Sequence, residues 1–373
     1  MSDIARFDRI DVHRLCIPLA TPYRLAFGPV DHFDTIVVEI TDRDGRVGLG
    51  EATVLTGYTD ETIDDSWRVA RDFASQVATM DAGFAFDTIA TLGARYPFTA
   101  TAFGSALEMF AGSAALQMRE TTRVPVLGLL NAEREEAIAA EFEQLLAAGF
   151  RTIKVKVGID AIRDAQRVRT VQRVVAGRAR IRVDANQGYT ADEGVAFVEA
   201  LDPADIELFE QPCAAGDWDA HLAVARAASV PMMLDESIYG LDDIDRAAEL
   251  GAARYIKVKL MKLGTLERLA AAIARIKSLG MRAVLGNGVA CDLGCWMEAC
   301  IAARAIDNAG EMNGFLKARS QLLTTPLEFE AGAIVLRAGF SPRLDHGRIA
   351  PYRLDSAGFA RTAVAIAARE ASQ

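Results

Sequence analysis

The stretch Arg151-Thr-Ile-Lys-Val-Lys-Val-Gly158 reads as a short β-strand that ends at a glycine. Because side chains alternate across a strand, Lys154 and Lys156 lie on one face, and the isoleucine and the valines lie on the other. Two lysines on one face of an apolar strand are, taken alone, typical of a solvated sheet edge. The residues that follow this strand favour a different interpretation.

Downstream of Val124, short apolar strands alternate with longer helical stretches. The predicted strands are residues 152–157, 181–184, 207–210, 232–235, 255–259 and 282–285, with a last apolar segment near 314–316. The helical stretches cover residues 135–148, 160–176, 192–201, 218–228, 241–250, 265–279 and 291–306. This repeat is typical of a parallel sheet, and about seven or eight strands favour a closed (β/α) barrel over an open doubly wound sheet. No Gly-x-Gly-x-x-Gly motif follows an early strand, which gives dinucleotide binding little support.

The two ends of the chain follow another pattern. Residues 8–51 indicate β structure, with strands at 35–40 and 47–52 around a turn at 42–45, and residues 60–118 indicate helices, at 64–77 and 102–117. Strands followed by helices without alternation are typical of a separate α+β domain. After about residue 325 short strands return (327–329, 333–336, 352–354), so this tail is expected to pack on the N-terminal domain.

The composition excludes several classes of protein. A formal net charge of -10 argues against a nucleic-acid or anionic-membrane partner. Charges in the first nine residues leave no room for a signal peptide, and the most apolar window, 283–306, contains Asp292 and Glu298, so it is a poor membrane span. Five cysteines, three of them at near-helical spacing, indicate free thiols. We therefore predict a cytoplasmic enzyme that acts on a small molecule.

Charged residues recur at the ends of five successive predicted strands. They are Lys156, Asp184, Glu210, Asp235 and Lys259, separated by 28, 26, 25 and 24 residues. These separations are about the length of one βα unit. Functional side chains of a barrel lie at the C-terminal ends of its strands, where the loops form the mouth. The five groups should therefore converge there and compensate one another's charge.

The three acids among these residues predict a metal site. Asp184, Glu210 and Asp235 would repel one another without a cation, and no Cys or His accompanies them to suggest zinc. A hard divalent ion resolves that conflict; Mg²⁺ is the expected cofactor, and Mn²⁺ shares its preference for oxygen ligands. Lys156 and Lys259 would flank the ion, and a desolvated lysine beside a cation can serve as a base. Lys154 adds positive charge close to Lys156.

Five motifs in order now resemble a known family. They are Lys154-Val-Lys156, Val183-Asp-Ala-Asn-Gln187, Phe209-Glu-Gln-Pro212, Leu234-Asp-Glu-Ser237 and Ile256-Lys-Val-Lys-Leu-Met-Lys-Leu-Gly264. The set resembles the enolase superfamily, and more specifically its muconate-lactonizing-enzyme subgroup. The resemblance implies an α/β fold: a modified TIM (β/α)7β-type barrel over residues 124–325, an α+β capping domain over 1–123, and a C-terminal segment, 326–373, that completes the cap.

The resemblance also assigns roles. Asp184, Glu210 and Asp235 match the metal ligands, and Lys156 and Lys259 match the two acid/base catalysts, with Lys154 as the electrostatic partner of Lys156. Lys257 shares a strand face with Lys259 and is expected one layer deeper. The mandelate-racemase subgroup would need a histidine after the seventh strand. That position reads Leu285-Gly-Asn-Gly288, far from His13, His32, His221 and His346 in the sequence, so the two-lysine chemistry stands.

The implied reaction is removal of the proton α to a substrate carboxylate through an enediolate. A second lysine that returns the proton on the opposite face makes the enzyme an isomerase, either a racemase/epimerase or a cycloisomerase, on a small carboxylic or N-substituted amino acid. A β-elimination, as in a dehydratase or o-succinylbenzoate synthase, is the alternative with one base. A barrel that binds metal and carboxylate without turnover is the non-enzymatic alternative, which needs no acid/base pair. Relatives are commonly symmetric homo-oligomers, so the resemblance implies one here.

Substrate-binding residues are expected in the capping loops, 19–30 and 54–61, and at the last strands. The candidates are Tyr23, Phe27, Tyr58, Asn186, Asn287, Glu311 and Lys317, and the aromatic ones among them are equally compatible with ordinary packing. Dipeptide epimerases of this subgroup carry Asp-x-Asp near the eighth strand, where this chain has Glu311-Met-Asn313. This departure weakens the case for a dipeptide substrate. Lys317 is expected either to meet a second anionic group of the substrate or to form a surface ion pair.

Overall fold

The barrel carries the parallel sheet that the sequence predicts. The computed structural model describes residues 7–25, 28–79 and 82–361. Seven strands lie in the order β11-β10-β9-β8-β7-β6-β5, each parallel to its neighbours. Their bounds are β5 Gly128–Leu130, β6 Thr152–Lys156, β7 Arg180–Asp184, β8 Ile206–Glu210, β9 Met232–Leu234, β10 Tyr255–Val258 and β11 Arg282–Leu285.

A short segment joins the two edges of this sheet. Glu311 donates its backbone N–H to the carbonyl of Leu285 at the end of β11, at 2.9 Å. Gly310 exchanges backbone hydrogen bonds of 2.9 Å with Pro125 and Leu127, just before β5. Gly310 and Glu311 therefore take the place of an eighth strand, and this position brings the Glu311 side chain into the barrel mouth.

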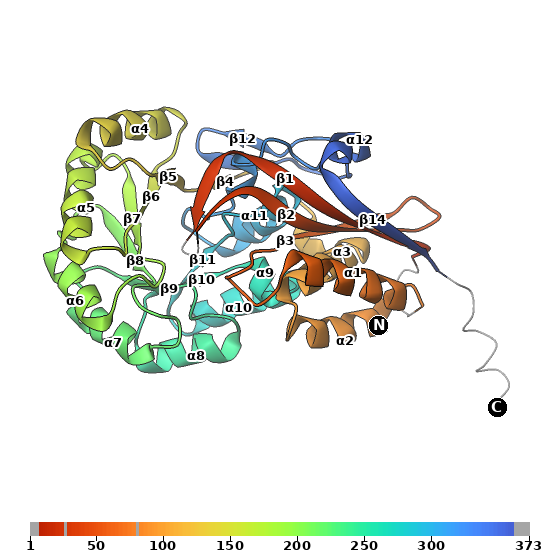
Figure 1. Ribbon diagram of the computed structural model, residues 1–373, viewed down its shortest axis with the longest axis horizontal. Helices are drawn as coiled ribbons and strands as arrows, with labels where there is room; N and C mark the ends of the chain where they lie inside the picture. Colours follow the sequence, from red (N-terminus) through yellow and green to blue (C-terminus); the bar gives the residue numbers. More distant parts are fainter. Residues whose placement is uncertain (1–6, 26–27, 80–81, 362–373) are drawn as a thin grey trace.

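Helices cover the outside of the strands. They are α4 Glu135–Ala147, α5 Ala161–Val175, α6 Ala191–Ala200, α7 Trp218–Ala227, α8 Leu241–Leu250, α10 Leu266–Ser278 and α11 Asp292–Ala305, and α4 to α8 follow one another around the rim in Figure 1. Asp160 starts α5 by accepting backbone N–H groups, and Thr190 with Glu193 forms a capping box on α6. The apolar faces of the strands pack against these helices, while Leu208, Met233, Tyr255 and Val284 form a small apolar layer of their own.

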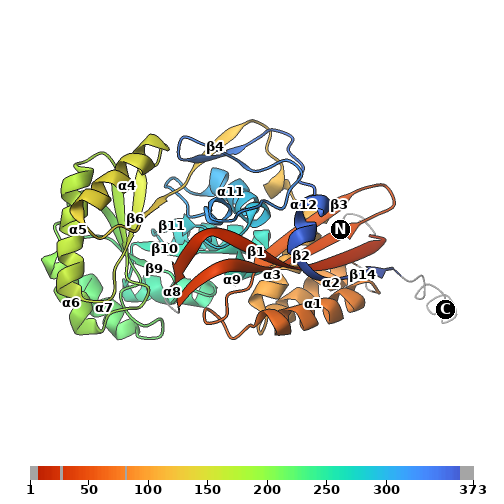
Figure 2. The ribbon, with the colours of Figure 1, turned by 45° about the horizontal axis from the view of Figure 1, so that its top comes forward.

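The capping domain is an antiparallel sheet with helices on one face. Its strands are β1 Arg9–Leu25, β2 Gly28–Thr41, β3 Val47–Thr53 and β14 Arg353–Ala360, in the order β14-β1-β2-β3, so the C-terminal segment completes the sheet. Helices α1 Ile63–Val77, α2 Ala82–Gly93 and α3 Pro97–Phe110 belong to this domain. The long strands β1 and β2 extend toward the barrel (Figure 2), and the backbone of Ala20 bonds to the carbonyl of Lys317 at 2.8 Å.

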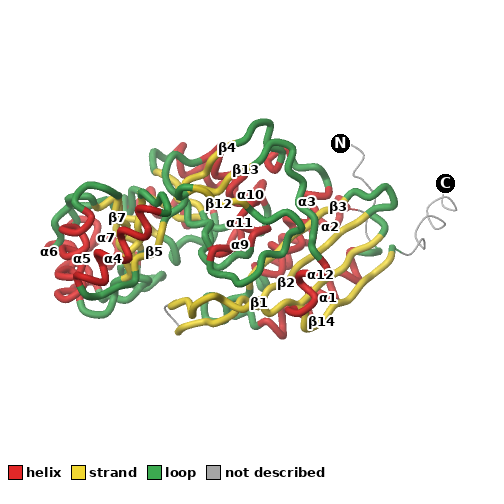
Figure 3. Tube along the Cα trace, turned by 90° about the horizontal axis from the view of Figure 1, so that it is seen from above, coloured by secondary structure: helices red, strands yellow, loops and turns green. Residues whose placement is uncertain are grey.

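A third, smaller sheet lies beside the barrel. It contains β4 Thr122–Pro125, β12 Glu328–Glu330 and β13 Ala333–Leu336, in the order β12-β13-β4. Short helices complete the chain: η1 Ala114–Leu116, α9 Leu260–Leu263, η2 Gly314–Leu316, α12 His346–Ile349 and η3 Ala350–Tyr352. Figure 3 shows α12 beside the strands of the capping sheet. No helix within the described ranges is long and apolar enough to cross a membrane.

Some local predictions were wrong. The last apolar segment near 314–316 is a 3₁₀ helix rather than a strand. The helix predicted at 102–117 begins earlier and ends at Phe110, with a separate 3₁₀ turn after Gly112, whose φ of 78° only glycine adopts readily. The strand predicted at 352–354 starts at Arg353 and runs to Ala360, because pairing with β1 extends it through residues without an apolar pattern.

Candidate active site

The strand register brings the predicted charged residues to one level. Lys156 on β6 pairs with Asp184 on β7, and Asp184 pairs with Glu210 on β8. Asp235 follows directly after β9, and Lys259 follows directly after β10. Strand ends that follow one another around a barrel therefore place these five groups at one mouth, as predicted from their spacing.

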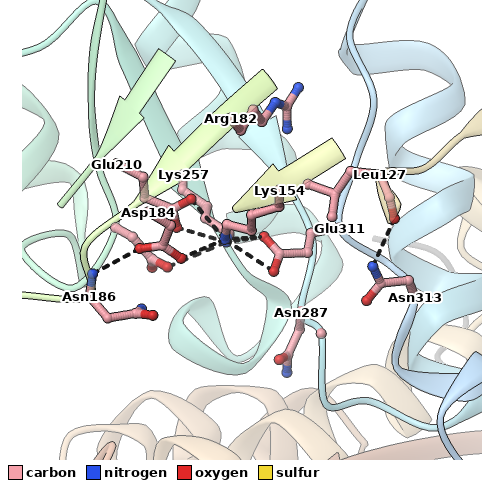
Figure 4. Close-up of polar contacts among 12 residues, drawn as sticks. Leu127, Lys154, Arg182, Asp184, Asn186, Glu210, Lys257, Asn287, Glu311 and Asn313 are labelled. Carbon is pink, nitrogen blue, oxygen red and sulfur yellow. Dashed lines mark hydrogen bonds and ion pairs between the residues drawn. The ribbon is translucent and has the colours of Figure 1, made fainter. Parts of the chain in front are cut away.

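Lys154 lies at the centre of the cluster (Figure 4). Its Nζ lies 2.8 Å from Asp184 Oδ2, 2.8 Å from Glu210 Oε2 and 2.9 Å from Glu311 Oε2. The side chain is only 1% exposed. Burial by itself lowers the pKa of Lys154, but the three carboxylates outweigh it and raise that pKa well above the ordinary value. Lys154 is therefore a permanently charged residue inside the barrel.

Lys156 occupies a more open position at the end of β6. Its side chain is 30% exposed, and its Nζ lies 2.8 Å from Asp184 Oδ2 and donates to Asn186 Oδ1. Burial lowers the pKa of Lys156 and Lys154 lowers it too, but Asp184 outweighs both, so the pKa lies above its ordinary value. Pairing with Asp184 therefore favours the charged form of Lys156.

Lys259 is enclosed by the capping domain. Its Nζ lies 2.8 Å from Asp235 Oδ2 and donates to the Tyr58 hydroxyl at 2.9 Å. The same ammonium lies 4.7 Å from the centre of the Tyr58 ring. Tyr58 OH also donates to Asp235 Oδ1 at 3.3 Å. Lys262, from the short helix α9, holds Asp235 from the other side at 3.0 Å.

Lys257 and Glu311 form the floor of the cluster. The Nζ of Lys257 donates to Glu210 Oε1 at 3.0 Å and to Glu311 Oε2, and it is 2% exposed. Lys257 therefore lies deeper than Lys259, as predicted. The carboxylate of Glu311 is bonded to both Lys154 and Lys257, which hold its pKa well below the ordinary value against the opposing effect of burial.

The backbone after Asp184 and after Glu210 adopts an unusual conformation. Asn186, Gln187 and Gln211 have φ values of 42°, 68° and 40°, in the left-handed region that side chains with a Cβ seldom adopt. Such residues concentrate at functional sites, where the surroundings hold them in place. Gln211 is buried, and its Oε1 accepts the backbone N–H of Asp235 at 2.8 Å. The residue after Glu210 therefore positions Asp235.

The charged groups line a cavity of about 370 Å³ between barrel and cap. Of the predicted substrate-binding residues, Tyr23, Tyr58, Asn186, Asn287 and Glu311 line it. Phe27 lies outside the described residues. Asn287 is fixed by Glu298, which accepts its backbone N–H at 3.0 Å. The size is that of a small-molecule site.

Lys317 does not line this cavity. It borders a second cavity of about 720 Å³ instead. Tyr23 lines both cavities and lies between Lys317 and the charged cluster. The Lys317 Nζ turns inward, donating to Gly288 O at 2.8 Å and Asn313 Oδ1 at 2.7 Å, and lies 4.6 Å from the centre of the Tyr23 ring. Burial lowers the pKa of Lys317 to about 8. The expected surface ion pair is wrong, since neutral oxygens hold this ammonium.

The donor set fits a hard divalent cation. Burial and the neighbouring Asp184 raise the pKa of Glu210 to about 7, although Lys154 and Lys257 oppose them. Glu210 Oε2 makes a single contact, the 2.8 Å ion pair with Lys154, and Glu236 Oε2 has no hydrogen-bond partner among the residues that the structure describes. Buried carboxylate oxygens gathered in one place are the ligands that Mg²⁺ or Mn²⁺ prefers.

Several site residues were missed by sequence reasoning. Glu236, Gln211, Tyr239, Lys262 and Glu298 all contact the residues described above. Glu236 directly follows Asp235, and Gln211 directly follows Glu210, in the sequence motifs. Their position next to predicted metal ligands could have identified them as site residues. Nothing in the sequence indicates that Glu298, on the outer helix α11, reaches the backbone N–H of Leu260 at 2.8 Å.

Comparison with known proteins agrees with this architecture. The family described as Enolase C-terminal domain-like matches residues 137–345. The hydrophobic dipeptide epimerase of Citrifermentans bemidjiense is 33% identical over 315 residues, 77% of this chain and 81% of that protein. The o-succinylbenzoate synthase of Geobacillus stearothermophilus is 29% identical over 276 residues, 68% of this chain and 70% of that protein.

A solved structure shares the whole fold. The dipeptide epimerase from Cytophaga hutchinsonii, crystallised with Mg and the dipeptide D-Ala-L-Val, has a TM-score of 0.84 over 95% of this chain and 100% of its own, at 19% identity. The matched family, the relatives and the shared fold lead to one conclusion. The chain belongs to the Enolase C-terminal domain-like family, and it is an enzyme of the mandelate racemase/muconate lactonizing enzyme group within the enolase superfamily.

Proposed function

We propose that this enzyme is a racemase or epimerase of a small N-substituted amino acid, removing the proton α to the carboxylate and returning one on the opposite face. One observation carries this proposal. The ammonium groups of Lys156 and Lys259 lie on two sides of the carboxylate set, each 2.8 Å from a different acid, Asp184 or Asp235. A binding protein needs no such pair, and a one-base reaction needs only one of them.

The residues of the chain divide the chemistry between them. One of the lysines, Lys156 or Lys259, takes the α proton, and the other supplies a proton to the opposite face. Lys154 and Lys257 remain charged beneath them and stabilise the negative charge that the enediolate develops on the carboxylate oxygens. Tyr58 and the capping sheet exclude water from the Lys259 side, which strengthens these interactions.

Asp184, Glu210 and Asp235 are the proposed ligands of a divalent cation, with Mg²⁺ as the first choice and Mn²⁺ compatible with the same oxygens. When bound, the ion supplies positive charge that holds the substrate carboxylate and acidifies its α proton. The solved relative from Cytophaga hutchinsonii contains Mg, which supports this choice. Without the ion, five lysines and five acids balance one another's charge at the site: Lys154, Lys156, Lys257, Lys259 and Lys262 with Asp184, Glu210, Asp235, Glu236 and Glu311. An added divalent cation makes the site positive, which favours an anionic substrate.

The surroundings of Glu311 favour substrates with a blocked amino group. A free ammonium needs an unengaged carboxylate, and Glu311 is already bonded to Lys154 and Lys257. N-acyl amino acids are therefore expected to react faster than free dipeptides, although a dipeptide epimerase is among the relatives. Elimination is the second candidate, supported by the o-succinylbenzoate synthase among the relatives.

Solvent deuterium incorporation tests the proposal. The enzyme is incubated in D₂O with N-acyl amino acids and dipeptides of both configurations, with Mg²⁺ or with EDTA, and the α position is followed by NMR. We expect exchange and loss of optical purity with Mg²⁺, both abolished by EDTA. Exchange that survives EDTA, or no exchange with any α-substituted carboxylate, would contradict it. An unsaturated product without racemisation would select elimination.

We propose a cytoplasmic, homo-oligomeric enzyme, as the relationship to symmetric oligomers suggests. Light scattering coupled to size-exclusion chromatography measures the mass directly, and a 40.2 kDa species would contradict the oligomer.

A further inference from the structure

A histidine in the capping sheet has no hydrogen-bond partner. His13 lies in β1, is 5% exposed, and neither of its ring nitrogens is bonded within the described part of the chain. An unbonded buried polar group costs about 1–3 kcal/mol, so each one requires a physical explanation. His13 lines neither of the two cavities described above.

The strand register places an acid next to this histidine. His13 pairs with Val37 on β2, and Asp11 pairs with Glu39, so Glu39 is the diagonal neighbour of His13 on one face of the sheet. Diagonal neighbours on an antiparallel pair lie within reach of long side chains. Asp11, which shares this face, is bonded to Arg9.

A second histidine reaches the same point from the C-terminal segment. His346 begins α12, and its Nε2 lies 3.0 Å from Glu39 Oε2. The rings of His13 and His346 lie 5.7 Å apart, nearly perpendicular. One donor atom from each of the three residues lies within 4.8 Å of the other two. The side chain of His346 is 54% exposed, so an ion has access and the ring can rotate toward it.

We propose that His13, Glu39 and His346 form a binding site for a transition-metal ion of the Zn²⁺ class, separate from the barrel site. Two imidazoles and one carboxylate are a set that Zn²⁺ prefers, with a fourth position left for water. The all-oxygen site in the barrel selects a harder cation instead. Bonds of about 2.0–2.1 Å require small donor separations, which the 3.0 Å between Glu39 and His346 already meets.

The electrostatics of the face suit a metal ligand. Neither ring nitrogen of His13 is hydrogen-bonded within the described residues, so a nitrogen lone pair is available to an ion. Burial, followed by the nearby His346, lowers the pKa of His13. Burial raises the pKa of Glu39, and His346 opposes this. The other charged groups facing the site are Asp11, Arg343 and Arg353.

The position suggests what the ion does. His13 and Glu39 belong to the first two strands, whereas His346 lies just before β14, the strand that completes the capping sheet. An ion bound by all three therefore fastens the C-terminal segment onto the sheet. Its contribution is to stability, and turnover in the barrel is expected to be independent of it.

Zn²⁺ titration of the full-length protein tests this site. Isothermal calorimetry in excess Mg²⁺, which occupies the barrel ligands, is expected to show one Zn²⁺ per chain, and Co²⁺ is expected to give the visible absorption of a tetrahedral site with nitrogen ligands. His346→Ala should weaken Zn²⁺ binding by about 100-fold or more, since even changes outside the ligand shell cost 10–100-fold. The Zn²⁺-induced rise in melting temperature should disappear with it.

His32→Ala is the matched control. His32 is also exposed on the capping sheet and lies near Cys16 and Asp34, another group with donor atoms within 4.8 Å. Loss of affinity in His32→Ala but not in His346→Ala would move the site there and overturn the proposal, as would the absence of any Zn²⁺ binding outside the barrel. His13→Gln provides a second test within the sheet. If it fails to fold, the exposed His346→Ala variant still decides.

Discussion

The two proposed catalytic lysines lie in different surroundings. The side chain of Lys156 is 30% exposed and is held by residues of the barrel alone, Asp184 and Asn186. The side chain of Lys259 is 9% exposed, and Tyr58 of the capping domain bonds to its ammonium and covers it. One side of the site is therefore complete in the barrel, whereas the other is completed only when the cap packs on it.

The Lys259 side also has more support behind it. Lys262 holds Asp235, and Tyr239 donates to the backbone of Tyr58 at 3.3 Å. Glu298 accepts the N–H of Leu260, the residue after Lys259. These contacts come from α9, α11 and two loops, so the geometry of this lysine depends on tertiary packing. The geometry of Lys156 depends mainly on the register of two neighbouring strands.

Replacing each lysine by alanine should have the largest effect and should separate the two sides. Lys156→Ala and Lys259→Ala are each expected to lose racemisation by about 10²–10⁴-fold, the usual contribution of a positioned acid or base. Each variant should stop α-proton exchange in D₂O for one isomer and retain it for the other, because only one face loses its base. NMR of both isomers measures this. Retained exchange on both faces in either variant would contradict the assignment.

The sequence could predict the part of the site that follows from strand spacing. Lys156, Asp184, Glu210, Asp235 and Lys259 recur once per βα unit, and parallel strands in register must bring their ends together. The fold followed from the same alternation. The hydrophobic period of a strand or helix and the length of a βα unit are properties of contiguous residues. They can therefore be recognised in the sequence without knowledge of tertiary contacts.

The contacts between distant segments could not be predicted in this way. The bond between Tyr58 and Lys259 joins residues 201 positions apart, and the bond between Glu298 and Leu260 depends on how α11 packs. Glu311 was a candidate for substrate binding, but its place between Lys154 and Lys257 follows from the two-residue link that joins the barrel edges. Burial of Lys317 against Tyr23 likewise depends on how the end of β1 packs against the barrel.

Changing the neighbour of each lysine should give a smaller, one-sided effect. Tyr58→Phe keeps the ring but removes the hydroxyl between Lys259 and Asp235, and Asn186→Ala removes the acceptor beside Lys156. We expect each to slow, by about 10-fold, the exchange that its own lysine performs, since a hydrogen bond to a charged group contributes about 1.5–3 kcal/mol.

The two variants are controls for each other. Exchange rates for the two isomers are compared in both proteins, and the slower isomer should switch between them. Equal slowing of both isomers by Tyr58→Phe would mean that the cap closes the whole cavity rather than supporting Lys259. Tyr239→Phe, which loses only a bond to the backbone, should change the rates least.

The smallest effect concerns the packing of the cap behind the Lys259 side. Glu51 on β3 accepts the backbone N–H of Cys291 at the start of α11, at 2.6 Å, while its Oε2 has no hydrogen-bond partner in the described part of the chain. Burial, with the nearby Asp292, raises the pKa of Glu51 from 4.5 to about 8. Folding therefore takes up a proton between these two values, and the free energy of unfolding falls as the pH rises through that window.

Glu51→Gln should remove this dependence. At pH 8 the variant is expected to be more stable than the wild type by about 1 kcal/mol. The pKa shift alone, at about 1.4 kcal/mol per pKa unit, would give a larger value. The gain is smaller because the new amide N–H₂ also lacks a hydrogen-bond partner. At pH 4.5 the advantage should vanish, since Glu51 is then protonated in the folded protein. Urea unfolding at both values measures the difference, with the surface variant Glu328→Gln as control. The opposite result, a variant that loses stability relative to the wild type as the pH rises from 4.5 to 8, would mean that the ionised carboxylate stabilises α11. The cap would then be held on the Lys259 side by a charge rather than by a buried neutral acid.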